Sequence, residues 1–384
     1  MCDITHFLFE TRVIDAAGLC RPGINRPYKV VPIMVHASRS ATFIIVACCA
    51  VLLNGCYLWK QGTRMFSYTM EASPVSKLLQ RPETPDSLKR FFALVNEIRT
   101  FAFDSIGLRR TANYTTYMSI NKGYLINVVS ASGKADFTPY TWCYPLFGCW
   151  PLRGYFDRAD ADSEAARLSR KGYDVYVGRV DAFSTLGFLS DPLYSFMKNF
   201  PVYELANLII HEQTHATVYV KNQVDFNEEL ACFTGSEGAL RFIRAKYGDT
   251  SAAYTASVKT AQDIDTYYRL MRSLYNRLSA VYKSGISVDD KLRQKQAIIA
   301  HFKDSLAAGY DSLFLTPSFK GLEKANINNA FVSADMTYTL DLDLFYRLYK
   351  EKDRDLRAVM QSIKVLSKEK GDCRGHLREL LDSR

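Results

Sequence analysis

One short segment limits the folds open to this chain more than any other feature. It is HEQTH at 211–215, within the apolar run LIIHEQTHATVY. Residues four positions apart lie on one face of an α-helix, so the imidazoles of His211 and His215 can reach a single cation. Glu212 is offset by one position and can contact a metal-bound water without binding the metal. The segment therefore predicts a buried helix, over about 202–219, with a metal ion on one face.

This set of residues suits peptide hydrolysis. Zinc lowers the pKa of a bound water to about 7, and a carboxylate can take the proton as the water attacks a carbonyl. We predict that Glu212 acts as this general base and then protonates the leaving amine. Given the His and Glu frequencies of the chain, roughly 0.005 chance matches are expected. The competing interpretation is a pair of hydrogen-bonded structural histidines on a buried helix.

A catalytic zinc site needs a third protein ligand and one open position for water. Few histidines are available as the third ligand, because the chain has only six in total. In the metzincin pattern a glycine and then a third histidine follow three and six residues after His215. Val218 and Lys221 occupy those places, which excludes that class.

The letters NEELA at 227–231 resemble the N-E-x-x-A signature of gluzincin peptidases. There the first glutamate binds zinc and the alanine permits close helix packing. The resemblance implies that Glu228 is the third ligand, with Glu229 and Glu237 as alternatives; a solvated acidic helix start is the competing interpretation. Twelve residues lie between His215 and Glu228, fewer than in most gluzincins, so the connection between the two helices must be tight.

The similarity extends beyond these two motifs. The chain resembles a bacterial family of predicted aminopeptidases, often lipoproteins, with an H-E-x-x-H motif and a downstream F-N-E. Over about residues 57–365, the stretches that carry the resemblance are HEQTH, FNEELA, WCYPLFGCWPLRGYF, GYDVYVGRVDAFSTLGFLSDP and INNAFVSADMTY. The resemblance implies a metallopeptidase of gluzincin topology that holds one zinc ion and removes N-terminal residues from peptides.

In gluzincins a strand beside the motif helix pairs with the substrate backbone. Residues 183–189, FSTLGFL, would supply that strand here, and a core strand without substrate contact is the alternative. The residues expected to meet the substrate are Ser184, Thr185, Leu186 and Gly187.

The oxyanion that forms opposite the zinc needs a hydrogen-bond donor. Because histidines are so few, a tyrosine is the natural candidate, and we predict Tyr338 in the MTY that follows Asn328-Asn329. His301 is the rival, although it lies on an expected helix where a surface position is usual.

An apolar run at 41–53 predicts a targeting segment. Its thirteen residues suit the core of a signal peptide and are short for a helix that spans a bilayer. The run ends in LNGC, which resembles a bacterial lipobox, so we expect Cys56 to carry a lipid anchor. Met34 lies where a normal signal peptide would start, and an uncleaved signal anchor is the alternative. Either interpretation places the protein on a membrane of the bacterial cell envelope, outside the cytoplasm.

Five of the nine cysteines lie in this N-terminal region. Cys143 and Cys149 form a close pair in TWCYPLFGCW, where Pro145 and Gly148 allow the chain to turn back. We expect them to form a disulfide, as an extracytoplasmic compartment permits. A zinc site with two cysteine ligands is the rival, but no second Cys or His pair lies nearby in the sequence.

Residue periodicity predicts an α+β fold whose small sheet and motif helix form a gluzincin-like core, followed by a largely helical part. Helices are expected at 85–106, 160–171, 202–219, 227–247, 252–283, 288–308 and 340–367. Strands are expected on either side of 121–123 and at 173–180 and 183–189. The expected parts are an upstream extension with signal peptide (1–55), an α+β metallopeptidase core (56–250) and a helical portion that completes the active-site domain (251–384).

The formal net charge of +9 reflects 49 Lys and Arg against 40 Asp and Glu. Much of the basic excess follows residue 240, where acidic residues are interleaved with it. Such mixing is typical of a solvated helix surface, whereas nucleic-acid binding needs a one-sided basic face. We therefore expect peptide and membrane partners and no nucleic acid.

Two alternatives to an aminopeptidase keep the same site. One is an inactive, peptidase-like envelope protein that binds peptides or partners, against which the intact Glu212 argues. The other is an endopeptidase or amidase. An exopeptidase needs a carboxylate for the substrate ammonium group, and Glu204, two turns before His211, lies too far along the helix to be an obvious choice.

Overall fold

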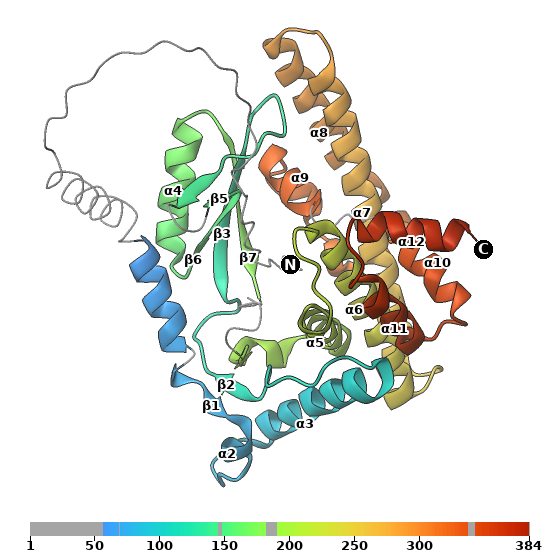
Figure 1. The fold of residues 1–384 in the computed structure, drawn as a ribbon. Helices are drawn as coiled ribbons and strands as arrows, with labels where there is room; N and C mark the ends of the chain where they lie inside the picture. Colours follow the sequence, from blue (N-terminus) through green and yellow to red (C-terminus); the bar gives the residue numbers. More distant parts are fainter. Residues whose placement is uncertain (1–56, 69, 145–147, 182–189, 337–341, 384) are drawn as a thin grey trace, which may run out of the picture.

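A computed structural model shows the fold of the chain (Figure 1). The residues that it describes are 57–68, 70–144, 148–181, 190–336 and 342–383. Over these residues the fold is α+β, with three small sheets and a larger set of helices.

The main sheet has the order β6-β3-β7, and all neighbours are antiparallel. The central strand β3 (Ile126–Ser132) is buried throughout. It lies between β6 (Leu152–Tyr155) and β7 (Asp174–Val180). Helix α4 (Arg158–Arg170) packs on one face and α9 (Asn329–Met336) on the other (Figure 1). The expected strand at 173–180 and helix at 160–171 are thus both present.

The two smaller sheets are short. In one, β2 (Thr116–Met118) pairs with β1 (Ser73–Pro74) and runs parallel to β8 (Leu193–Tyr194). Strands β2 and β3 are the two expected around 121–123, but they belong to different sheets. The other sheet joins β4 (Trp142–Tyr144) to β5 (Gly148–Trp150), where a disulfide links Cys143 to Cys149.

Two helices occupy the centre of the molecule, α5 (Val202–Thr217) and α6 (Val224–Tyr247) (Figure 1). Helix α3 (Asp86–Phe101), extended by a π-helical turn (Ala102–Ile106), packs against α5. Their apolar faces share one hydrophobic core, to which α10, α11 and α12 contribute from the far side of α6. The C-terminal helices are thus part of the core that holds α5 and α6.

A long helical hairpin follows α6. Helices α7 (Ala252–Lys283) and α8 (Val288–Leu313) pack together and share a second hydrophobic cluster with α9. Side-chain oxygens of Ser251 and Ser287 cap their first turns. Shorter helices within the described ranges include α2 (Val75–Leu79), η2 (Ser195–Asn199), η3 (Pro317–Phe319) and η4 (Leu322–Lys324).

The prediction of a single helix at 340–367 is wrong. The structure has two helices there, α10 (Asp343–Glu351) and α11 (Leu356–Leu366). Asp353 and Arg354 both adopt positive φ, at 50° and 58°, which ends the first helix. The side chain of Asp355 then accepts hydrogen bonds from backbone N–H groups of α11 and starts the second. The periodicity also missed α9 and α12 (Cys373–Asp382).

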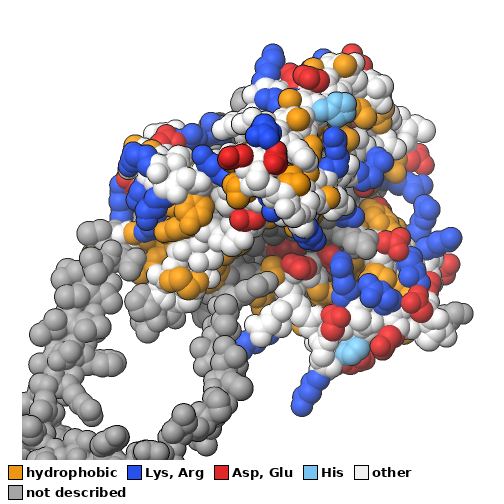
Figure 2. Space-filling model, turned by 90° about the horizontal axis from the view of Figure 1, so that it is seen from above, with side chains coloured by type: hydrophobic (Ala, Val, Ile, Leu, Met, Phe, Trp, Pro, Cys, Tyr) orange, Lys and Arg blue, Asp and Glu red, His pale blue; other side chains and the backbone are white. Residues whose placement is uncertain are grey.

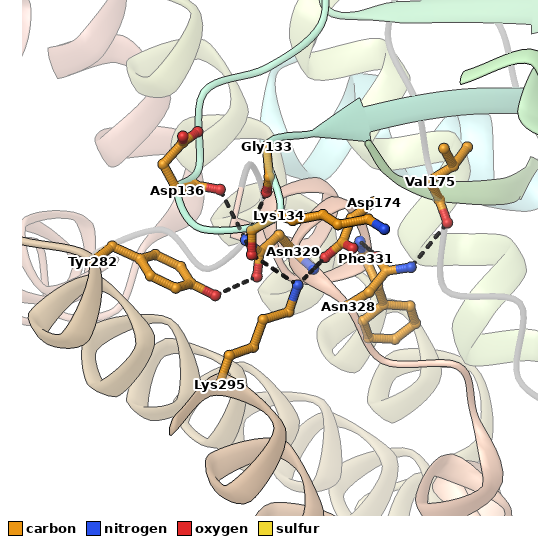
Figure 3. A network of polar contacts seen from close by, with 10 residues as sticks. All are labelled: Gly133, Lys134, Asp136, Asp174, Val175, Tyr282, Lys295, Asn328, Asn329 and Phe331. Carbon is orange, nitrogen blue, oxygen red and sulfur yellow. Dashed lines mark hydrogen bonds and ion pairs between the residues drawn. The ribbon is translucent and has the colours of Figure 1, made fainter. Parts of the chain in front are cut away.

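A buried polar network fixes α9 against the end of the main sheet (Figure 3). The Asn329 amide donates 2.8 Å hydrogen bonds to the carbonyl oxygens of Gly133 and Asp136, and its Oδ1 accepts one from the Tyr282 hydroxyl. Lys295, on α8, forms a buried ion pair with Asp174 at the start of β7. Because every member has partners, the network orients α9 rather than merely burying it.

On the face shown in Figure 2, basic and acidic side chains are intermingled, and the basic ones do not gather on one side. Within the described ranges, no helix has both the length and the hydropathy that a membrane span requires.

Candidate metal centre

Helix α5 carries both histidines deep in the core. It begins after Pro201, and apolar residues such as Leu208 and Ile209 bury it before the motif starts. The exposed fractions of His211, Glu212 and His215 are 5%, 3% and 8%. Polar groups buried so deeply need partners, which makes this part of the core unusual.

Close packing brings α6 against the histidine face of α5. A Cβ added at Gly235 would lie 3.0 Å from the backbone oxygen of Asn207 and 3.2 Å from the Cβ of His211. One added at Gly238 would lie 2.9 Å from Ile106 and 3.0 Å from Ile210. A larger residue would force the helices apart. These two glycines are therefore part of what brings α6 within reach of the imidazoles.

The connection between α5 and α6 is as tight as the short spacing requires. It spans only residues 218–223, and Asn222 takes a left-handed conformation, with φ at 63°. The Asn227 side chain accepts a 2.9 Å hydrogen bond from the Val220 N–H and donates a 2.8 Å bond to the Val220 carbonyl. This clamp fixes the start of α6, where Glu228 lies.

Three side chains converge on one point: His211, His215 and Glu228. The two histidine Nε2 atoms are 3.1 Å apart. Glu228 lies 3.6 Å from His211 Nε2 through Oε2 and 3.4 Å from His215 Nε2 through Oε1. Ligand atoms bound at about 2.0–2.1 Å to a tetrahedral zinc are about 3.3 Å apart. One carboxylate oxygen of Glu228 faces each imidazole, and the three side chains lie close enough together to share a metal ion.

Electrostatics favour a cation at the same point. Burial lowers the pKa of His215 to about 3, so its imidazole is neutral, the form that binds metal. Burial raises the pKa of Glu212 well above its usual value, and the charges of Asp191 and Glu228 raise it further. One Glu212 oxygen is buried without a hydrogen-bond partner among the described residues. A divalent ion would relieve this concentration of buried carboxylates, so the residues fit such an ion.

The alternative ligands turn away from this point. Glu229 is buried, but its Oε2 accepts a 3.1 Å hydrogen bond from Arg374 on α12. Glu237 lies two turns beyond Glu228 and hydrogen-bonds with Tyr346 and Tyr349 of α10. Neither is in the group of side chains close enough together to share an ion.

A loop before β2 reaches the motif helix, and the sequence interpretation missed it. The Thr111 hydroxyl donates a 3.0 Å hydrogen bond to Gln213, and the Tyr114 N–H donates a 2.6 Å bond to the backbone oxygen of Asp191. Tyr114 has a φ of 62°, rare for a bulky residue. Its buried hydroxyl has no hydrogen-bond partner among the described residues. The pKa of Tyr114 is raised by burial and by the charges of Glu212 and Asp191.

Nothing in the local sequence marks Tyr114, one of 24 tyrosines, or Asp191 as neighbours of Glu212. Only the loop contacts bring them there. The rival donor His301 is an exposed residue of α8. Several predicted site residues lie outside the described part of the chain, namely Cys56, Ser184, Thr185, Leu186, Gly187 and Tyr338.

A comparison with protein families finds one match. A family model described as "Putative aminopeptidase" matches residues 56–377. No curated protein and no solved structure matches the chain.

Proposed function

The chain belongs to the family described as putative aminopeptidases, and from this we propose that it is a zinc-dependent peptidase that removes amino-terminal residues from peptides. Family membership by itself indicates peptidase activity. The observation that supports the metal-dependent form is the convergence of His211, His215 and Glu228 within reach of one ion, with Glu212 on the same helix as the histidines.

The proposed roles follow from the positions of these side chains. The two imidazoles and the Glu228 carboxylate would hold the ion, which when bound lowers the pKa of water and polarises the scissile carbonyl. Glu212 takes the proton from the attacking water and delivers it to the departing amine nitrogen. Its burial suits this task, because desolvation raises its pKa toward the range of a general base.

The proposed substrate-binding strand and the proposed oxyanion donor are formed by residues outside the described ranges. We propose that Ser184, Thr185, Leu186 and Gly187 pair with the substrate backbone. We further propose that Tyr338 donates a hydrogen bond to the oxyanion. In the sequence Tyr338 is two positions after the end of α9, the helix that Asn329 holds in place (Figure 3).

We also propose a location for the protein. The apolar run at 41–53 and the lipobox-like LNGC support lipid attachment at Cys56 and a place in the bacterial cell envelope, outside the cytoplasm. There the enzyme would meet peptides in the periplasm or at the cell surface.

The function can be tested with matched peptides that have either a free or an acetylated amino terminus. We expect the purified, zinc-loaded protein to release the first residue from the free peptides only. We also expect a chelator to abolish the activity and added zinc to restore it. Mass spectrometry identifies the products. Equal cleavage of both sets at internal bonds would make the protein an endopeptidase, and no cleavage by zinc-loaded protein would contradict peptidase function.

Tyr114 is proposed as a positioning residue for Glu212. Its hydroxyl is buried near enough to that carboxylate for the charge of Glu212 to raise the pKa of Tyr114, and the backbone conformation that places it there is costly for a tyrosine. We propose that this hydroxyl, which has no hydrogen-bond partner among the described residues, donates to Glu212 during the reaction. Tyr114→Phe should then lower kcat about tenfold, with KM and zinc content retained.

The measurement is steady-state kinetics across a pH series, with metal analysis of each preparation. Tyr203→Phe is the matched control, because Tyr203 is equally buried on α5 but pairs with Ser236. If Tyr114→Phe leaves both kcat and the pH profile unchanged, the tyrosine has only a packing role.

A further inference from the structure

The first helical segment of the described chain, residues 57–68, has two different faces. Its inner face packs on β6 and the residue after it. The Tyr57 hydroxyl donates a 2.7 Å hydrogen bond to the Gly154 carbonyl, and its ring lies 5.4 Å from that of Tyr155. Gln61 accepts a 3.0 Å hydrogen bond from the Phe156 N–H. This face attaches the helix to the body of the protein.

The opposite face is apolar and exposed. Trp59, Phe66 and Met70 are 76%, 65% and 68% exposed. Trp59 and Phe66 are seven positions apart in this helix and so fall within about 20° of one another around its axis, and Met70 follows just after it. Among the described residues there are eleven exposed large hydrophobic side chains, and four lie between Leu58 and Met70. This clustering of exposed hydrophobic side chains in one short segment indicates a surface that a membrane or another molecule covers.

This apolar face lies close in the sequence to the predicted membrane anchor, which favours a membrane as the surface that covers it. Trp59 is only six positions after Leu53, the end of the apolar run at 41–53. Even a fully extended chain of that length spans only about 20 Å. The inference rests on the proposed membrane attachment: either anchor, the apolar run itself or a lipid on Cys56, would hold Trp59 close to a bilayer.

The chemistry of the segment also suits a bilayer surface. Tryptophan prefers the boundary between headgroups and acyl chains. The cations of the segment belong to its inner side, where Lys60 pairs with Asp160 at 2.6 Å and with Asp157 at 3.5 Å. An exposed apolar helix face that carries a tryptophan is therefore suited to the interfacial layer.

We propose that the face formed by Trp59, Phe66 and Met70 inserts into the interfacial layer of a phospholipid bilayer. In this arrangement the helix orients the peptidase, in addition to any tethering by the chain before it. The helix lies at the edge of the molecule beside β6 and α4, on the side opposite α10, α11 and α12 (Figure 1). Those C-terminal helices would therefore face away from the membrane.

The test uses the full chain reconstituted into vesicles of phosphatidylcholine and phosphatidylglycerol. Trp59 is a suitable probe, because Trp142 and Trp150, the other two tryptophans, are buried. We expect lipids brominated near the top of the acyl chain to lower Trp59 fluorescence by about twofold or more, and aqueous iodide to have little effect. Trp59→Phe should abolish the lipid-dependent quenching.

Two further variants separate insertion from mere proximity. In the Trp59→Phe background, Val365→Trp places a tryptophan on α11 at a residue that is 65% exposed. We expect iodide to quench this probe and brominated lipid not to do so. In the wild-type background, replacing Phe66 and Met70 with Ser should reduce lipid quenching of Trp59 by about half or more.

Three results would overturn the proposal. Trp59 could be quenched by iodide and not by lipid, which would place the face in water. It could be protected from both quenchers, which would indicate a protein partner or a second copy. Finally, the Phe66 and Met70 substitutions could leave lipid quenching unchanged, which would mean that the tether alone determines the position of Trp59. Circular dichroism of each variant verifies that it is folded.

Discussion

Replacing Glu212 with glutamine is expected to reduce kcat for peptide hydrolysis by about 10³-fold while zinc stays bound. The glutamine has the same shape but cannot accept a proton from the attacking water. A loss of that size corresponds to about 4 kcal/mol of transition-state stabilisation. Because Glu212 is not among the side chains that converge as ligands, the metal content should not change.

Steady-state kinetics and metal analysis of the same preparations measure this effect. Glu204→Gln is the matched control, since Glu204 is a partly buried carboxylate on the same helix, two turns before His211. We expect its kcat to stay within about twofold of the wild-type value. Unchanged hydrolysis by the Glu212 variant would show that the activity arises elsewhere.

Replacing Glu228 with alanine is expected to weaken zinc binding more than about a hundredfold. Substitutions of groups that only support a ligand already cost about 10–100-fold in metal affinity, and Glu228 would bind the ion itself. Competition with a chromophoric chelator gives the affinity. Zinc should raise the melting temperature of the wild-type protein but not of the variant, because only a ligand that binds the native state stabilises it.

The neighbouring carboxylate provides the control for this experiment. Glu229→Gln changes a residue that is just as buried but pairs with Arg374. We expect this variant to lose stability and to retain zinc affinity within about threefold. Zinc binding that survives Glu228→Ala but not Glu229→Gln would reassign the third ligand to Glu229.

We expect metal binding at the proposed site to be insensitive to the protonation of His215 over the working pH range. Burial lowers the pKa of His215 to about 3, so its imidazole stays neutral throughout the range in which the protein would work. Protons therefore do not compete with the metal for this ligand until strongly acidic pH.

Much of the architecture could be predicted from local patterns. The helices at 202–217, 252–283 and 288–313 were expected close to their observed bounds, because apolar residues recur along them at helical spacing. The motif 211–215 needs only one helical turn to place both imidazoles on one face, so its geometry is contained in the spacing itself.

The exceptions show where local patterns fail. The break between α10 and α11 depends on two left-handed residues, Asp353 and Arg354, within a run of charged residues that also suits a helix surface. Helix α9 has little apolar periodicity, and contacts of Asn329 with the main sheet hold it in place. In both cases the decisive energies come from backbone conformation or distant partners.

The same division applies to the candidate site. Residue types and spacing along the chain identify His211, Glu212 and His215, and a second short motif points to Glu228, because each pattern fits within one or two helical turns. Whether the two motifs meet depends on the close approach of α5 and α6 at Gly235. The placement of Tyr114 beside Glu212 depends on loops that only the folded chain brings together. Contacts between residues far apart in the sequence leave no periodic signal, since they arise only when separate helices, strands and loops pack into one core.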